Sequence, residues 1–254
     1  MFVFLYCNLS YIIFLTLLKL HMKKSAYRNY LPLLLLVFMI TPPSMFAQTT
    51  HEISTNELRD LAEGKRVPEF RAIETDGTPY LLDEFQKGSV LLRNGRTTET
   101  LTMNFNIHQN RVEYIDGDNI YAVDSDMIRG FTINDTDVQY KFGKGYTARG
   151  LNPDDLVRIL SDGKATVLVK HEVGFQRNVA TYGTATQKDA YVSRDILYII
   201  KEGDIERIRR IRERSILRSF DTYQKEMQNF AEENNLDLSS LEDIKTLFEY
   251  YNNL

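Results

Sequence analysis

The sequence contains a single cysteine, Cys7, among its 254 residues. Cys7 lies in an N-terminal segment that we expect to be removed on export, so the remaining chain has no thiol. This absence excludes disulfide bonds, a thiolate nucleophile and a thiolate-ligated metal from the mature protein. It also excludes a lipid anchor on a cysteine that follows the N-terminal apolar run.

Histidine is also scarce. Beyond the N-terminal segment the chain has His51, His108 and His171, with no His-x-His or His-x-x-x-His spacing. A transition-metal site needs several convergent ligands, so we expect no metal. On its apolar strand face, His171 is predicted to be a hydrogen-bonded core residue. No Gly-x-Ser-x-Gly elbow is present, and no carboxylate pair stands out for glycoside hydrolysis. We therefore expect no catalytic residues and no cofactor.

Two short polar patterns have a structural explanation that we prefer to a functional one. Residues 116–119 and 124–126 offer oxygen ligands, but the spacing and closing glutamate of a calcium loop are missing. Aspartate and asparagine are common in tight turns. Residues 143–145 resemble part of a phosphate loop without its Lys-Ser/Thr ending, which favours a flexible loop.

The N-terminus has the pattern of a secretory signal peptide. Lys23, Lys24 and Arg28 precede an apolar run at residues 31–40, and Ala47 supplies a small residue at the cleavage point. Residues 1–21 are apolar too. We favour an upstream extension of the reading frame over a second hydrophobic segment, although about 20 apolar residues suffice to span a bilayer. The expected location is the periplasm or the exterior, with membrane contact only through an uncleaved N-terminus.

The mature chain is acidic. Residues 1–47 hold four basic residues and no acids, so residues 48–254 carry 27 basic and 35 acidic side chains, a net charge of −8. This balance argues against nucleic-acid binding. The length suffices for a hydrophobic core without disulfides.

Residues 88–133 carry the clearest structural signal. Apolar and polar side chains alternate along residues 101–107, which predicts a strand with one dry and one solvated face. The dry set is Leu101, Met103, Phe105 and Ile107, and the solvated set is Thr102, Asn104 and Asn106. Turn residues at 94–95 and 116–118 separate neighbouring strand-like runs. Connections this short predict an antiparallel meander, because parallel crossovers need a dozen or more residues.

The segment before the meander is predicted to be a helix and a connector. Residues 49–65 form the helix, with a capping box at Ser54 and Glu57. Residues 80–85 are predicted to form one helical turn.

After the meander, strands are expected at residues 165–173, 195–201 and 205–211, and a polar loop at 174–189. From Ile216 onward apolar residues recur at helical spacing. Asp221 is predicted to cap a longer helix, and Ser239 with Glu242 to form a second capping box before the last helix.

One basic cluster stands out against the acidic background. Its members lie between the last strand and the helices and are Arg207, Arg209, Arg210, Arg212, Arg214 and Arg218. Arginine suits carboxylate and phosphate recognition, so the cluster is a candidate docking site for an acidic protein or an anionic lipid head group. The alternative is a solvated edge that blocks sheet aggregation, partly neutralised by Glu206 and Glu213.

Three stretches of the sequence resemble a group of secreted envelope proteins of Gram-negative bacteria to which no function is assigned. They are residues 88–95, residues 104–107 and the closing residues 248–254. The likeness covers most of residues 80–254. Its motifs are turns, a strand and a C-terminal helix, so the resemblance implies export and a fold but no catalytic residues.

Together these patterns predict an α+β fold dominated by an antiparallel sheet, built as a curved sheet, partial barrel or sandwich. The expected divisions are a signal segment at 1–47, a helix and connector at 48–87, the β domain at 88–211 and helices packed on the sheet at 212–254. The predicted function is an exported, non-enzymatic binding or assembly protein, acting through a concave sheet face or the arginines. A carrier of an apolar ligand, held beneath the helices, is second, and an unrecognised hydrolase is third.

Overall fold

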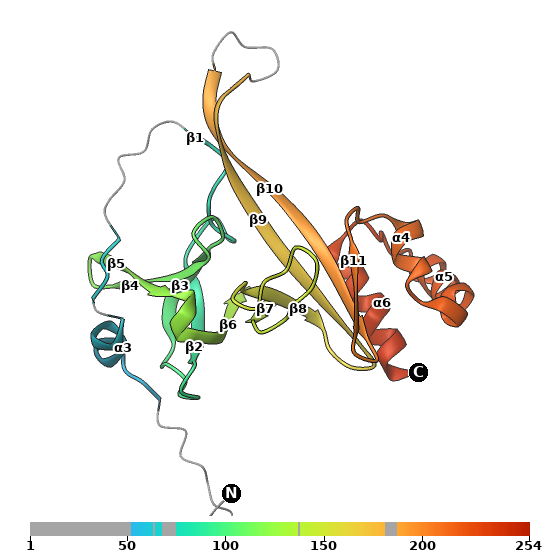
Figure 1. Ribbon diagram of the computed structural model, residues 1–254, viewed down its shortest axis with the longest axis horizontal. Helices are drawn as coiled ribbons and strands as arrows, with labels where there is room; N and C mark the ends of the chain where they lie inside the picture. The colour runs from blue at the N-terminus through green and yellow to red at the C-terminus, as the bar shows by residue number, and fades with distance from the viewer. Residues whose placement is uncertain (1–51, 63, 68–74, 137, 181–186) are drawn as a thin grey trace, which may run out of the picture. The chain divides into compact units, whose positions relative to one another are not determined.

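Figure 1 shows the computed structural model of the chain, with each helix and strand labelled. It describes residues 52–62, 64–67, 75–136, 138–180 and 187–254. The predicted signal segment and His51 lie outside these residues. None of the described helices is long and apolar enough to cross a membrane.

Eleven strands form one open sheet. Their bounds are β1 Thr75–Asp76, β2 Gln86–Leu92, β3 Leu101–Asn106, β4 Arg111–Asp116, β5 Asn119–Asp124, β6 Ile128–Asp135, β7 Val138–Gly143, β8 Val157–Ser161, β9 Ala165–Ala180, β10 Gln187–Lys201 and β11 Asp204–Ile208. The order across the sheet is β1-β10-β9-β8-β7-β6-β2-β3-β4-β5, and β11 also pairs with β10. Every pairing is antiparallel except that of β1 with β10. The predicted fold class is confirmed.

The helices lie at the two ends of the described chain. They are α3 Thr55–Leu61, α4 Glu213–Arg218, α5 Gln224–Glu233 and α6 Leu241–Asn253, with short 3-10 turns η1 Ser125–Met127 and η2 Asp221–Tyr223. The Ser54 half of the predicted capping box is present at the first helix, because Ser54 Oγ accepts a hydrogen bond from the Glu57 N–H at 3.3 Å.

The dry face of β3 is buried as predicted. Leu101, Met103 and Phe105 are at most 3 % exposed. The Phe105 ring lies 5.2 Å from the rings of both Phe131 and Phe142, which stack on each other at 4.4 Å between centroids. Aromatic packing of this kind supplies much of the apolar burial that stabilises a sheet core.

On the opposite face of β3, Thr102 is partly exposed, but the prediction of a solvated face is wrong for Asn104 and Asn106. Asn104 and Asn106 are buried, because residues 79–85 cross over them. Asn104 accepts a hydrogen bond from the Leu82 N–H at 3.3 Å and donates one to the Leu82 carbonyl at 2.7 Å. The side-chain amide thus satisfies backbone groups that burial would otherwise leave unpaired.

The covering segment also corrects the expected helical turn at residues 80–85. This segment is a series of bends with a β-bridge between Tyr80 and Asn106. The Leu81 N–H donates to the Phe105 carbonyl at 2.9 Å, so the backbone bonds to the sheet and not to itself.

Two long strands, β9 and β10, take up residues 174–180 and 187–189 of the predicted polar loop, and its residues 181–186 lie outside the described residues. The pairing runs from Ala165 with Lys201 to Ala180 with Gln187. The outer half of this hairpin mixes polar and apolar residues without regular alternation, so it lacks the pattern by which a strand with a buried face is recognised in sequence. Its contacts are instead local, such as the rings of Phe175 and Tyr191 at 5.1 Å.

The C-terminal helices cover the inner half of the same hairpin. Val167, Val169 and Leu197 of the sheet share a core with Phe220 and Phe248, all nearly inaccessible to solvent. Arg158 of β8 reaches Glu242 of α6 at 2.6 Å, between its guanidinium and the carboxylate.

Two predicted helix starts differ in the structure. Asp221 lies in η2 with φ of +50° and does not cap α5 through its side chain. The N-cap of α6 is Ser240, one residue beyond the predicted Ser239. The Ser239 hydroxyl bonds to the Asp237 carboxylate at 2.7 Å, and Glu242 pairs with Arg158, so neither is left for the capping box.

Candidate functional site

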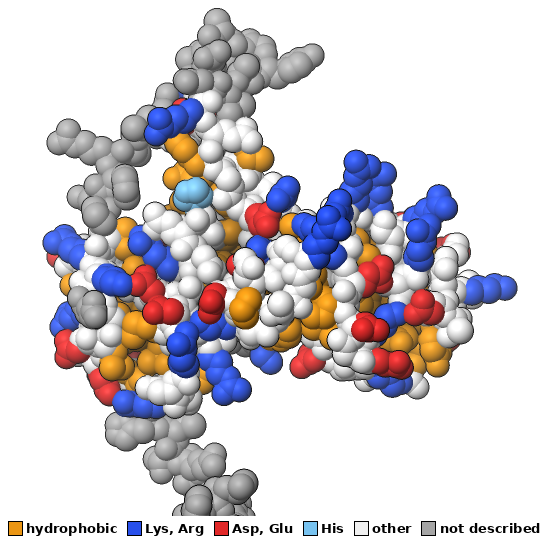
Figure 2. Space-filling view, in the orientation of Figure 1, with side chains coloured by type: hydrophobic (Ala, Val, Ile, Leu, Met, Phe, Trp, Pro, Cys, Tyr) orange, Lys and Arg blue, Asp and Glu red, His pale blue; other side chains and the backbone are white. Residues whose placement is uncertain are grey.

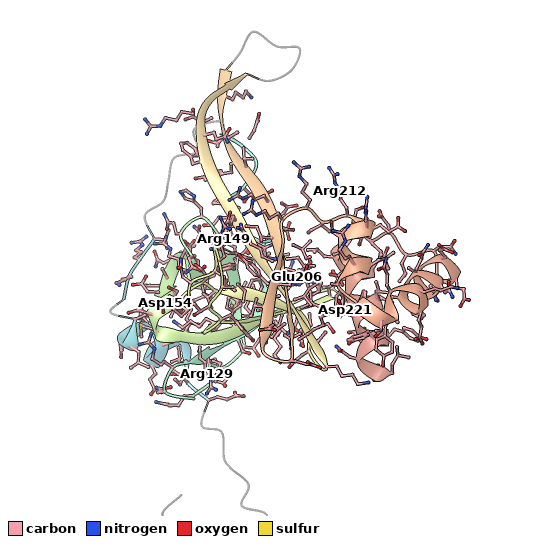
Figure 3. All side chains as sticks on the ribbon, turned by 45° about the vertical axis from the view of Figure 1, so that its right-hand side comes forward. Arg129, Arg149, Asp154, Glu206, Arg212 and Asp221 are labelled. Atoms are coloured by element: carbon pink, nitrogen blue, oxygen red, sulfur yellow. The ribbon has the colours of Figure 1, made fainter. Side chains whose placement is uncertain are left out.

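The last strand and the helices are joined by a short, arginine-rich connection. β11 ends at Ile208, opposite Leu197 of β10, and the chain then bends toward α4. We call the arginine segment the five residues Arg209, Arg210, Arg212, Arg214 and Arg218. Figure 2 shows basic side chains gathered at this part of the surface, and Figure 3 labels Arg212 among them.

All five members of the arginine segment are exposed. Among the described residues none of them forms an ion pair, although several other arginines of the chain do. Arg59 pairs with Asp116 and Arg96 with Glu57, at 2.8 and 2.6 Å. Among the described residues, Glu206 and Glu213 form no ion pairs with these arginines, so the expected partial neutralisation does not take place through direct contacts. The guanidinium groups are therefore free to bind an external anion.

Arg207, the sixth predicted member, has a different environment. It lies within β11, and its guanidinium lies close to Gly150, so that a Cβ there would lie 3.2 Å from the arginine Cζ. Its Nε is buried and has no hydrogen-bond partner among the described residues. Arg207 packs against the loop that follows β7 and does not belong to the exposed cluster.

A cavity of about 530 Å³ lies between the turn after β3 and the hairpin of β9 and β10. Its size is within the range of small-ligand sites. Its wall is mixed: Phe105, Ile107, Leu156, Val173 and Val192 are apolar, and Asp155, Lys170, Glu172 and Arg194 are charged.

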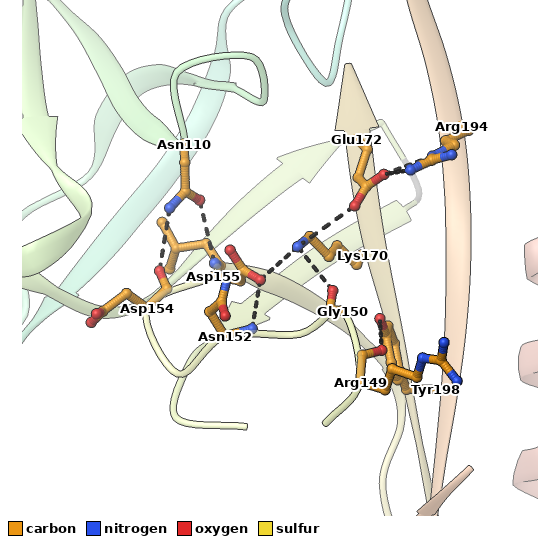
Figure 4. A network of polar contacts seen from close by, with 11 residues as sticks. Asn110, Arg149, Gly150, Asn152, Asp154, Asp155, Lys170, Glu172, Arg194 and Tyr198 are labelled. Carbon is orange, nitrogen blue, oxygen red and sulfur yellow. Dashed lines mark hydrogen bonds and ion pairs between the residues drawn. The ribbon is translucent and has the colours of Figure 1, made fainter. Parts of the chain in front are cut away.

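The charged groups of this cavity already neutralise one another (Figure 4). Lys170 Nζ lies 2.6 Å from an Asp155 carboxylate oxygen and 3.6 Å from Glu172. Arg194 lies 2.5 Å from the Glu172 carboxylate. Asn110, which also lines the cavity, donates to the Asp154 carbonyl at 3.2 Å. The network ties the loop at 150–155 to β9 and presents little net charge.

His171 lines the same cavity and is the hydrogen-bonded histidine that the sequence predicts. Its Nδ1 lies 2.6 Å from the Asp195 carboxylate on β10, which fixes the ring orientation. Its Nε2 is buried and has no hydrogen-bond partner among the described residues. Ser193 lines the cavity too, but no hydrogen bond joins it to His171, so the described groups do not form a nucleophile and base pair.

The polar turns weighed as ion sites have local partners. Asp116 pairs with Arg59, and Asp124 with Lys65. Lys144, in the glycine-flanked loop, donates to the Ser125 carbonyl at 2.6 Å. Within the described residues no group of three or more histidine, cysteine, aspartate or glutamate side chains is placed to hold a metal ion.

Comparison with known proteins does not assign the chain to a family. No protein-family model matches the chain, and neither the curated proteins nor the solved structures contain a significant match.

Sequence reasoning found the arginine segment and missed the cavity. The segment was visible because its charges are contiguous in the chain. The cavity is built from residues of β3, the loop before β8, and β9 with β10, which are far apart in sequence. The one available signal was that Lys170, Glu172 and Arg194 interrupt apolar strands.

Proposed function

We propose that this chain is an exported, non-enzymatic binding or assembly protein of the cell envelope, and that its arginine segment binds an acidic region of a protein partner. One observation carries the proposal: five exposed arginines fall within ten consecutive residues of an acidic chain, and none of them forms an ion pair among the described residues. Such a cluster attracts anions at long range and fixes them at short range.

An acidic protein fits this surface better than a lipid bilayer does. The planar guanidinium fork matches a carboxylate through two parallel hydrogen bonds. Membrane-bound helices bury apolar side chains below the head groups. In α4 the apolar residues Ile216 and Leu217 are buried against the protein, at 0 % and 5 % exposure, and are not free to enter a membrane.

The packing beneath the helices favours a binding surface over the carrier alternative. A carrier of that kind needs a sizeable apolar cavity under α4, α5 and α6. Phe220, Ile244 and Phe248 fill this region and are at most 1 % exposed. The cavity described above lies instead beside β3 and β9, and its charged lining suits an apolar cargo poorly.

The proposal is tested by binding of the purified protein to fluorescent polyglutamate. The double variant Arg209→Glu/Arg210→Glu is expected to bind at least about tenfold more weakly, since each lost charge pair is replaced by repulsion. Affinity of the wild type is expected to fall steeply with salt, because exposed charges are screened.

The control is the double variant Arg93→Glu/Arg129→Glu, which changes two other exposed arginines and gives the same net charge. It is expected to bind nearly as the wild type does. An equal loss of polyglutamate affinity in both variants would show that only the net charge matters, and would contradict the proposal. Tight binding to vesicles of anionic phospholipid, with none to polyglutamate, would contradict an acidic protein partner and identify the arginine segment as a membrane-binding site. Recovery of the protein with residues 1–47 intact in the cytoplasm would contradict export.

A further inference from the structure

We propose, resting on the function proposed above, that the acidic partner binds as an extended segment and adds a strand to β10. The site is the free edge of β10, by which we mean residues 191–196, beside the arginine segment. Main-chain hydrogen bonds would supply the docking geometry, and the arginines would select for acidic side chains.

The two sides of β10 are paired differently. On one side β9 pairs along the whole strand. On the other side β1 pairs only with residues 189–190 and β11 only with residues 197–201. No described strand pairs with residues 191–196 on that side, and Figure 1 shows β1 and β11 at opposite ends of this gap. An interior strand of the sheet therefore has no neighbouring strand along these six residues, and beyond Tyr191, against which Gly77 lies, its edge is open.

The backbone groups of Ser193 point into this gap. The Val173 carbonyl of β9 accepts a hydrogen bond from His108 Nδ1 at 3.0 Å, so the backbone of Val173 faces away from β10. Val173 and Ser193 are directly opposite, and they are therefore a non-hydrogen-bonded pair. The N–H and C=O of Ser193 consequently face the free edge.

A second observation supports the same orientation of the β10 backbone groups. A Cβ on Gly77, the residue after β1, would lie 2.6 Å from the Tyr191 carbonyl oxygen, so that carbonyl points toward the β1 side. Residues two apart on a strand present their backbone groups to the same side. Ser193 and Asp195 therefore offer donors and acceptors to an incoming strand.

The gap has the length and exposure that an added strand needs. Six residues of strand span roughly 20 Å, enough for the five or six residues of an ordinary strand. Val192, Ser193 and Arg194 are exposed to solvent. Val192 is 45 % exposed and offers an apolar contact to alternate side chains of the partner. An unpaired edge of this kind is a template for another chain.

Charge selects the partner. β11 ends where Ile208 pairs with Leu197, and Arg209 and Arg210 follow at once. A strand that filled the gap would continue along the line that β11 leaves, so its end would meet these guanidinium groups. An extended segment that alternates acidic and apolar residues satisfies both the edge and the arginines.

The test uses a labelled synthetic peptide of alternating valine and glutamate, about eight residues long. Fluorescence anisotropy compares it with the same sequence methylated on every backbone nitrogen, which keeps the charge and removes the donors. The unmodified peptide is expected to bind at least about tenfold more tightly. Equal binding of the two peptides, with dependence on Arg209 and Arg210, would overturn strand addition and leave the proposed function standing.

A variant of the protein gives an independent measurement. Ser193→Pro removes an N–H that faces the gap and spares the bonds to β9, so it is expected to weaken peptide binding about tenfold. Ser193→Ala keeps the N–H and is expected to bind as the wild type does. Thermal unfolding checks that both variants fold. Unchanged binding by a folded Ser193→Pro variant would overturn the inference, as would failure of the wild type to bind the peptide while it binds polyglutamate.

Discussion

Tyr114 lies in the core of the meander, and its hydroxyl has no hydrogen-bond partner among the described residues. Burial, reinforced by the nearby Asp116 carboxylate, raises the pKa of this tyrosine from 10.0 to about 12. A buried hydroxyl without a hydrogen-bond partner lowers the stability of the fold. From the sequence pattern alone, Tyr114 is predicted only to be a buried position in a strand. At this scale the pattern predicts which side chains are buried and does not predict whether their polar atoms are satisfied.

Tyr114→Phe is expected to raise stability by about 1 kcal/mol near neutral pH, because it removes an unpaired buried hydroxyl. The wild type should lose stability as pH rises from 10 toward 12, since the unfolded tyrosine releases its proton before the folded one does. The variant should lose less over this window. Urea midpoints below and above pH 10 measure both effects. Tyr223→Phe, at an exposed tyrosine, is the control and should change neither.

The buried polar residues of β3 show why local patterns are incomplete. Asn104 and Glu113 lie directly opposite on β3 and β4 and are buried, on the face predicted to be solvated. Glu113 accepts hydrogen bonds from Tyr80 at 2.6 Å and Asn106 at 3.0 Å, and it pairs with Arg111 at 2.7 Å. Alternation identified the face correctly, but the chain segment that covers it comes from elsewhere in the sequence.

At the scale of elements, the side chain of Asn252 attaches the last turn of helix α6 to the sheet. Asn252 accepts a hydrogen bond from the Ala165 N–H at 2.8 Å and donates to the Ala165 carbonyl and to Ser161 Oγ, each at 3.0 Å. Gly163 permits this approach, because a Cβ there would lie 2.7 Å from Asn252 Cγ. The helix was predictable from its spacing, whereas its attachment to the turn between β8 and β9 was not.

Asn252→Ala is expected to destabilise the protein by about 1–3 kcal/mol, since it leaves backbone groups of Ala165 without their partner. Hydrogen exchange should rise first in α6 and at the start of β9. Asn253→Ala provides a matched control, because the exposed Asn253 side chain donates its hydrogen bond to the Glu249 carbonyl of its own helix, at 2.8 Å. A similar loss of stability in both variants would contradict an attachment specific to Asn252.

The length of β9 and β10 is the largest difference between sequence and structure at this scale. Predicted strands at 165–173 and 195–201 extend to Ala180 and from Gln187. Polar and apolar residues are mixed without regular alternation in the outer half, and a period-two pattern requires a buried face to be visible. This extension creates the free edge of β10. Because the outer half has no buried face, the sequence pattern did not predict the strands there, and the inferred binding site could not be predicted either.

At the scale of the whole molecule, the sheet and its helices form a support with filled cores, and the features open to a partner lie at one margin. The antiparallel sheet was predictable from short turns and alternation, and the arginine segment from its composition. The strand order was not, because β6 pairs with β2 and not with β5, so that β3, β4 and β5 form one end of the sheet. Pairings between distant segments leave no local signal.

The most direct test of the account is a map of backbone amide shifts in the isotopically labelled protein, with and without the peptide of alternating valine and glutamate. The account predicts that the changes concentrate at residues 191–196 and 209–218, and that added salt reverses them. Changes confined to the parts of the cavity outside β10, at residues 105–110, 155–156 and 170–174, or to the surface of α5 and α6, with residues 191–196 and 209–218 unaffected, would contradict it.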